Sequence, residues 1–196
     1  LGMASEYVPS VGEVAKGEKL FDSFATDAWL ANWDAPKNDN SAMRNGTCIK
    51  MDVGGSLEYR ARGSRKENFG NIVNELTSLI EQNNDYYSMT KADVLSSLKH
   101  VTNISDEQVW KIIENVPVEF RNYALGQKML TRRDFIKKFE TIFEKMDETK
   151  YNSILDMVND AKLQAINEFD EGTNVASLLG YEQTALGFEG LLNTRD

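Results

Sequence analysis

Apolar residues repeat at helical spacing along most of this chain, beginning near its start. Between residues 17 and 32 they recur at intervals of three or four positions, which places them on one face of a helix that can be buried. The members of this series are Phe21, Phe24, Ala28 and Ala31. The pattern predicts a first helix over residues 17–32 that leads directly into Trp33 and Asp34.

The second half of the chain has the same helical period. We expect further helices over residues 69–82, 90–100, 105–115, 131–146 and 149–169. Ser105 followed by Gln108 has the spacing of a capping box, in which each side chain bonds the other residue's backbone N–H. Thr131 followed by Asp134 is a weaker version of the same start signal. Most of the chain is therefore expected to be helical.

The region between the first helix and residue 69 has a different pattern. Residues 35–47 are rich in Asn, Asp, Pro and Gly, which is typical of a loop. Residues 48–53 are predicted to form a short strand that delivers Asp52 at its end and stops at Gly54 and Gly55. Residues 56–70 are interpreted as a second short strand and a basic loop. The predicted fold class is α+β and mostly α-helical, with a small β region.

Composition and charge exclude several classes of function. The chain has 196 residues, a formal net charge of −9 and a pI near 4.8, so we do not expect a nucleic-acid partner, since domains that bind phosphate backbones usually carry a basic surplus. The only cysteine is Cys48 and the only histidine is His100, which excludes an intramolecular disulfide and a multi-cysteine or multi-histidine metal site.

The hydropathy pattern also bears on location. No apolar run approaches the ~20 residues that span a bilayer, so no membrane span is expected. The start of the sequence lacks the basic and apolar regions of a signal peptide, and the single cysteine suits a reducing compartment. These features predict a cytoplasmic protein, with delivery by another route left open.

The candidate chemistry lies between the first helix and the glycine pair. Asp34 follows a helix, Asn40 lies in the adjoining loop, and Asp52 ends a strand. Phosphoryl transfer needs groups that position a hydroxyl and hold Mg²⁺ against phosphate oxygens, and carboxylate and amide oxygens suit that ion. In this interpretation Asp34 orients the attacking hydroxyl, Asn40 and Asp52 bind Mg²⁺, and Gly54 lets the backbone turn beside the phosphates. The structural alternative is that these residues only cap a helix and form turns.

The order Asp34…Asn40…Asp52-Val53-Gly54-Gly55 resembles the catalytic loop and metal-binding region of the protein-kinase-like superfamily, in the form found in HipA-like and phosphoinositide kinases. The stretches DAWLANWD, MDVGGSLEYRARG and FG-x-x-V-x-E-L resemble more closely a kinase-like domain of bacterial and phage polyvalent or toxin-type proteins. SDEQVWKIIENV and RRDFIKKFE are similar to the helical end of that domain. The resemblance covers residues 3–145.

The resemblance implies the C-terminal lobe of a kinase-like fold and an ATP- and Mg²⁺-dependent phosphotransferase that acts on a protein or another hydroxyl acceptor. It implies that residues 1–16 are a hinge-like extended segment, in which Glu6, Tyr7 and Val8 meet adenine. Residues 17–146 would be the lobe, and residues 147–196 a helical C-terminal extension. The smaller lobe, with its phosphate-covering loop, would come from a missing N-terminal segment or a partner chain.

One departure from the family pattern bears on the metal ligand. This chain has Ala35-Pro36-Lys37 where the relatives carry Val-Val-Gly, and its loop is shorter. Asn38 or Asp39 are therefore alternatives to Asn40.

A basic cluster follows the glycine pair, at the place of a kinase activation segment. Its members are Arg60, Arg62, Arg65 and Lys66. Arginine pairs with phosphate or acidic groups through bidentate hydrogen bonds, so the cluster is a candidate substrate or phosphate contact. The structural alternative is a solvated basic surface.

Two readings without catalysis also stay open. The chain is then either an inactive kinase-like module that binds a partner, or a phage- or toxin-associated structural domain whose helices after residue 120 make the contacts. For Asp27, the sequence allows either a brace for the catalytic loop or a buried structural hydrogen bond. Trp29 and Trp33 are interpreted as core anchors.

Overall fold

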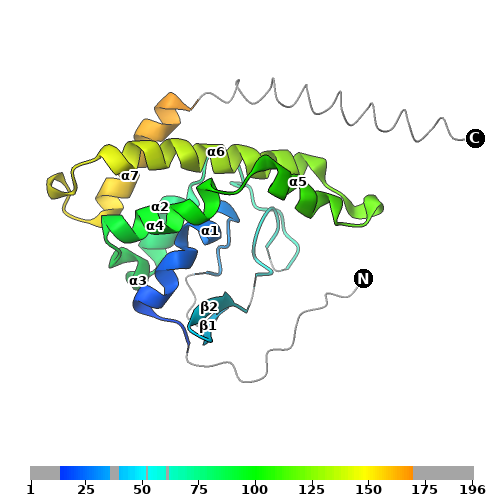
Figure 1. The fold of residues 1–196 in the computed structure, drawn as a ribbon, viewed down its shortest axis with the longest axis horizontal. Helices are drawn as coiled ribbons and strands as arrows, with labels where there is room; N and C mark the ends of the chain where they lie inside the picture. Colours follow the sequence, from blue (N-terminus) through cyan, green and yellow to red (C-terminus); the bar gives the residue numbers. More distant parts are fainter. Residues whose placement is uncertain (1–13, 36–39, 52, 61, 170–196) are drawn as a thin grey trace, which may run out of the picture.

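The computed structural model describes residues 14–35, 40–51, 53–60 and 62–169, and it is a mainly helical α+β fold with one two-stranded antiparallel sheet (Figure 1). The helical elements are η1 (Gly17–Ser23), α1 (Phe24–Trp29), α2 (Glu75–Gln82), α3 (Asn84–Tyr87), α4 (Lys91–Thr102), α5 (Asp106–Glu114), η3 (Val118–Phe120), α6 (Tyr123–Lys145), η4 (Glu148–Lys150) and α7 (Ile154–Glu168). The strands are β1 (Ser41–Arg44) and β2 (Thr47–Lys50).

The helices with the clearest start signals agree with the sequence. Helices α4 and α5 lie within two residues of their predicted ranges, and the capping box of Ser105 and Gln108 is confirmed. Three predicted starts are wrong, because α2 begins at Glu75 rather than residue 69, α6 at Tyr123 rather than residue 131, and α7 at Ile154 rather than residue 149. Thr131 therefore lies inside α6, whose actual N-cap is Asn122.

The predicted first helix is divided in two. Residues 17–23 form a 3-10 helix and residues 24–29 an α-helix. The α-helix ends before Asn32 because Ala31 adopts φ 50°, a left-handed conformation that an α-helix does not allow. The chain consequently turns sharply three residues before Asp34.

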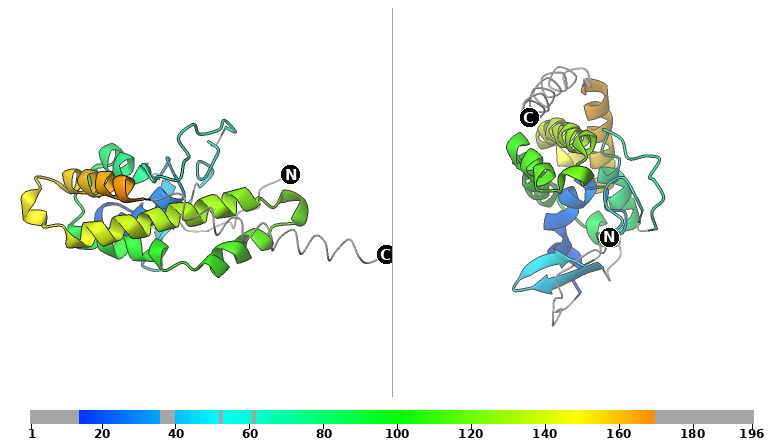
Figure 2. Two further views of the ribbon diagram at one scale, coloured as in Figure 1. Left: turned by 90° about the horizontal axis from the view of Figure 1, so that it is seen from above. Right: turned by 90° about the vertical axis from the view of Figure 1, so that its right-hand side faces the viewer.

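The second strand was placed wrongly by the sequence pattern. The partner of β2 is β1, which lies within the stretch expected to be a loop, and Tyr59 makes only an isolated bridge to Arg65. Asn45 and Gly46 connect the strands with φ of 51° and 80°, as a tight hairpin turn requires. The hairpin lies on the side of the molecule away from α6 (Figure 2).

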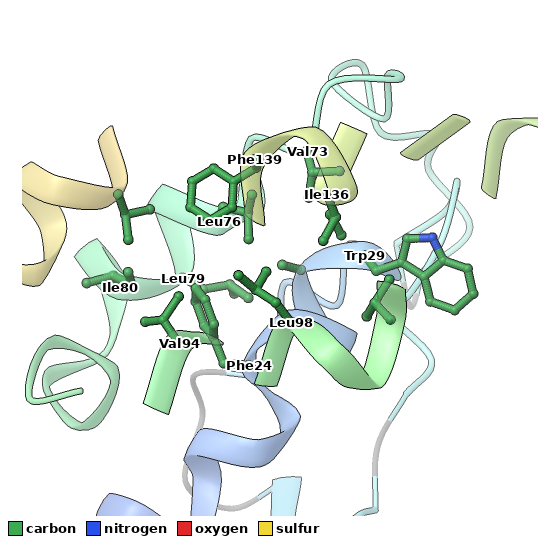
Figure 3. Close-up of a cluster of buried hydrophobic side chains, with 14 of the residues drawn as sticks. Phe24, Trp29, Val73, Leu76, Leu79, Ile80, Val94, Leu98, Ile136 and Phe139 are labelled. Carbon is green, nitrogen blue, oxygen red and sulfur yellow. The ribbon is translucent and has the colours of Figure 1, made fainter. Parts of the chain in front are cut away.

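The core is formed by helices that are distant in sequence. Phe24 of α1, Leu76 of α2, Leu98 of α4 and Ile136 of α6 are all fully buried and lie together in Figure 3. Helix α7 adds Val158 and other small residues to the same cluster. Burial of each large apolar side chain contributes roughly 1.5–3 kcal/mol, so this cluster fixes α1 against the longer helices.

A buried arginine connects α6 to the end of α1. The side chain of Arg132 is fully buried and lies 2.9 Å from the Glu75 carboxylate. It also donates to the carbonyl oxygens of Ala28, Trp29 and Gly70 at 2.9, 2.9 and 2.7 Å. The last carbonyls of a helix have no partner within the helix, so Arg132 supplies the donors that the end of α1 needs.

We expect Arg132→Met to lower the free energy of unfolding by about 3–5 kcal/mol, because it removes the cation that balances the buried Glu75 carboxylate and the donor to the Trp29 and Gly70 carbonyls. Urea denaturation measures the change. The double variant Glu75→Met/Arg132→Met removes the unpaired charge and should recover part of the loss. A loss below about 1 kcal/mol in the single variant would contradict this account of the core.

Candidate functional site

Asp34 lies in the turn that follows α1. Ala31 donates its N–H to the carbonyl of Ala28 at 3.0 Å, and Ala35 donates to Asn32 at 3.1 Å, so the backbone on both sides of Asp34 is fixed. The Asp34 side chain is partly exposed, whereas Ala35 is buried. The carboxylate is therefore held at the surface by a turn that is anchored in the core.

The second glycine of the pair packs against this carboxylate. A Cβ atom on Gly55 would lie 2.5 Å from Oδ2 of Asp34, so only glycine allows the approach. The N–H of Leu57 donates to the Leu30 carbonyl at 2.6 Å and fastens the glycine segment to the end of α1. Gly54, the predicted phosphate-side residue, is exposed next to Gly55.

Asn40 is connected to Asp34 through the backbone. Its amide nitrogen Nδ2 donates to the carbonyl oxygen of Asp34 at 3.0 Å, and its own carbonyl accepts from the N–H of Met51 at 2.9 Å. Asn40 thus joins the Asp34 turn to the hairpin. The sequence-based prediction assigns its amide oxygen Oδ1 as a Mg²⁺ ligand.

Several predicted site residues lie outside the described residues. These are Glu6, Tyr7, Val8, Asn38, Asp39 and Asp52. Within the described part of the chain, no three His, Cys, Asp or Glu side chains form a metal-binding group. The Mg²⁺ ligands and the adenine contacts stay predictions.

A pocket with a volume of about 490 Å³ opens beside Asp34. It is lined by Trp33, Asp34, Gly55, Arg60, Arg62, Ser64, Lys66 and Gln82. Arg60 stacks on the Trp33 ring with its guanidinium 5.1 Å from the ring centroid. Arg65 does not line this pocket and pairs instead with Glu58 at 2.5 Å. The structure therefore places three of the four predicted basic residues around Asp34.

Lys66 differs from the two arginines because it is buried. Its residue is 3% exposed, and its Nζ donates to the carbonyl oxygens of Ala31 and Gly55 and lies 4.9 Å from the Trp33 ring centroid. Burial lowers the pKa of Lys66 from 10.5 to about 8, while the nearby Glu75 carboxylate opposes this shift. The ammonium group is engaged by the protein's own backbone.

Asp27 is the centre of a buried network. It is 3% exposed, forms an ion pair with Lys50 of β2 at 2.8 Å, and accepts hydrogen bonds from Asn32 at 3.0 Å and Tyr86 at 3.1 Å. These contacts confirm the interpretation of Asp27 as a buried structural hydrogen-bonding group, and its role as a brace for a catalytic loop stays a prediction. Burial and the Asp27 charge raise the pKa of Tyr86.

The two tryptophans have different environments. Trp29 is buried and donates from Nε1 to the Met129 carbonyl at 2.9 Å, which confirms it as a core anchor. Trp33 is half-buried, donates to Glu75 at 3.0 Å and presents its ring to the pocket.

Lys66 gives a testable pH dependence of stability. Because its folded pKa is near 8, the unfolded chain binds more protons than the folded chain between about pH 8 and 10.5, so this group makes unfolding less favourable as the pH rises through that window. Below pH 8 both states are protonated and the cost of burying the charge is fully present.

We therefore expect the stability of the wild type relative to Lys66→Met to increase from pH 7 to pH 9.5. Urea denaturation at several pH values measures this difference. A difference that is constant or falls with pH would show that the folded pKa is not lowered.

The helices and the comparisons with known proteins add two further findings. Among the residues that the structure describes, no helix has the length and apolarity needed to cross a membrane. No protein-family model, no curated protein and no solved structure matches the chain. The site therefore has to be interpreted from its own residues.

Proposed function

We propose that this protein is an ATP- and Mg²⁺-dependent phosphotransferase of the kinase-like type, acting on the hydroxyl group of a protein or another acceptor. The observation that carries the proposal is the Asp34 carboxylate, which lies at a pocket walled by Arg60, Arg62 and Lys66 and is packed against Gly55. Such a site supplies the orientation and the positive potential that phosphoryl transfer requires.

In the proposed mechanism, Asp34 accepts or orients the proton of the acceptor hydroxyl. The geometry supports this role because the carboxylate faces the pocket while its backbone is held by Asn40. The Asn40 amide oxygen and the Asp52 carboxylate are the groups that would hold Mg²⁺, and the ion would supply charge neutralisation for the phosphates of ATP. The hydroxyl oxygen forms a bond to the γ-phosphorus as the bond to the leaving ADP oxygen breaks.

The charges that line the pocket favour an anionic ligand. Three cationic side chains and one carboxylate line it, in a chain whose net charge is −9. Arg60 is oriented by its stacking on Trp33, which reduces the entropy lost when its guanidinium binds phosphate. Arg65 forms an ion pair with Glu58, and for this reason it is a weaker candidate for a phosphate contact than Arg60 and Arg62.

The proposal includes a second structural part. The finer fold assignment, the C-terminal lobe of a kinase, implies a smaller lobe that covers the phosphates and is supplied by the same polypeptide or by a partner chain. Glu6, Tyr7 and Val8 would form the adenine-binding hinge between the two. The proposed location is the cytoplasm of a bacterium or a phage-infected cell.

One observation favours an interaction module as the second candidate function. Ile112, Val118 and Phe120, near the junction of α5 and α6, are exposed to 63%, 73% and 53%. Exposed apolar side chains that gather in one region often mark a contact surface. In this alternative the kinase-like half is inactive and binds a partner.

The main test is Asp34→Asn in the chain joined to any segment that precedes it in its gene. With Mg²⁺ and ATP we expect the wild type to release ADP and Asp34→Asn to lower kcat by about 100-fold or more, because the amide cannot accept the hydroxyl proton. Asp22→Asn, an exposed aspartate on η1, is the matched control and should keep full activity. Equal ADP release by wild type and Asp34→Asn would exclude the proposed role.

A second test uses the contact between the glycine and the carboxylate. Gly55→Ala should lower kcat by about 10-fold or more while the protein still folds, because the new methyl group displaces the Asp34 carboxylate. Gly70→Ala is the control, since its Cβ meets no atom within 4 Å. Circular dichroism verifies folding. Unchanged activity in a folded Gly55→Ala protein would show that the carboxylate position is not critical.

A further inference from the structure

The strongest unexplained feature of the pocket is that Lys66 is both charged and buried. No ion pair connects it to a described carboxylate, and its polar partners are two backbone carbonyls. An ammonium group taken out of water in this way is costly, and a methionine or leucine would fill the same space at lower cost. Departures of this kind from economical packing are concentrated at functional sites.

The two carbonyls belong to the two segments that enclose Asp34. Ala31 is the left-handed residue that ends α1, three positions before Asp34, and Gly55 is the residue against which the carboxylate packs. The ammonium also lies over the ring of Trp33, the residue directly before Asp34. The Lys66 ammonium therefore contacts the backbone of both segments that enclose the Asp34 carboxylate, and it also contacts the side chain of Trp33.

We infer that Lys66 is a positioning residue for phosphoryl transfer, which clamps Gly55 to Ala31 and so fixes the direction of the Asp34 carboxylate. The expected effect on kcat rests on the proposed function. The structural contact between Lys66, Gly55 and Ala31 does not. Lys66 is not a substrate contact in this assignment, which leaves Arg60 and Arg62 as the cations that meet the ligand.

A comparable lysine in the same protein provides a matched control. Lys128 of α6 donates to the Phe69 carbonyl at 3.2 Å and lies 5.1 Å from the Phe69 ring centroid, so it also combines a carbonyl contact with an aromatic one. It does not line the Asp34 pocket. Lys128→Met therefore removes similar contacts without touching the proposed clamp.

The kinetic arm compares Lys66→Met with Lys128→Met in the ADP release assay. We expect Lys66→Met to lower kcat by about 10- to 100-fold with a change in the KM for ATP below about threefold, since misplacement of a reacting group affects the chemical step more than binding. Lys128→Met should leave both values within about twofold. A folded Lys66→Met protein with wild-type kcat would overturn the inference and leave the proposed function intact.

The pH profile separates positioning from simple loss of packing. The ammonium faces Asp34, Glu75, Arg60 and Arg132, and its pKa is near 8. The wild-type kcat should fall as the pH rises through about 8, because the neutral amine is a weaker donor to both carbonyls. Lys66→Arg, which stays protonated, should keep a large part of the kcat and lose this fall. The same falling limb in Lys66→Arg would overturn the inference.

A spectroscopic arm tests the clamp without any activity. The carboxyl carbon of Asp34 is observed by NMR in protein labelled with ¹³C at the aspartate carboxyl carbons, and its resonance is assigned with Asp34→Asn. We expect Lys66→Met to shift this resonance and Lys128→Met to leave it in place. If neither Lys66→Met nor Lys66→Arg folds, the wild-type protein is measured instead, and the clamp predicts that the Asp34 resonance moves between pH 7 and 9. An Asp34 resonance that does not respond overturns the clamp. If the resonance responds but the protein does not turn over ATP, only the proposed function is overturned.

Discussion

The candidate site depends on the contact between Arg132 and the end of α1. This guanidinium is buried in the middle of α6, and three of its five donors reach carbonyl oxygens, while the charge is balanced by Glu75. Two of these carbonyls belong to the last turn of α1; that of Ala28 also accepts from the Ala31 N–H, whereas Arg132 is the donor to that of Trp29. The turn that presents Asp34 starts two residues later, so the position of the carboxylate is set by a contact that lies more than a hundred residues away in sequence.

Around that fixed end, the chain forms the site from backbone contacts more than from side-chain pairs. The Asn40 amide, the Leu57 N–H and the Lys66 ammonium all bond to carbonyl oxygens of the segment 30–34. The side chains that face the pocket, Arg60 and Arg62, come from a loop that carries little regular structure. Asp34 is thus held through its backbone, and Arg60 is oriented beside it by stacking on the Trp33 ring.

The sequence predicted what depends on local pattern and missed what depends on distant contacts. The mainly helical α+β fold, the limits of α4 and α5, and the capping box at Ser105 follow from period and cap chemistry. The hairpin had a readable signal, since Asn45-Gly46 between short apolar runs is typical of a tight turn, but the polar composition around it favoured a loop. Nothing local to Lys66 or Arg132 indicates burial, because each charge is accommodated by carbonyls that only the complete fold brings near.

The distribution of buried charge bears on the choice between an enzyme and an interaction module. Lys66 and Arg132 are both buried in an acidic protein; Lys66 donates to the Ala31 carbonyl, three residues before Asp34, and Arg132 donates to the carbonyls at the end of α1. A module that bound a partner only through the exposed apolar residues near α5 would draw no benefit from the desolvated Lys66, and an apolar residue in its place would avoid that cost, whereas Arg132 is explained by the donors that it supplies to the end of α1. Retaining a costly arrangement is understandable if the direction of one carboxylate matters to the protein. The proposed role of Asp34 would give this cost a purpose, and Lys66 therefore bears more directly on the choice than Arg132 does.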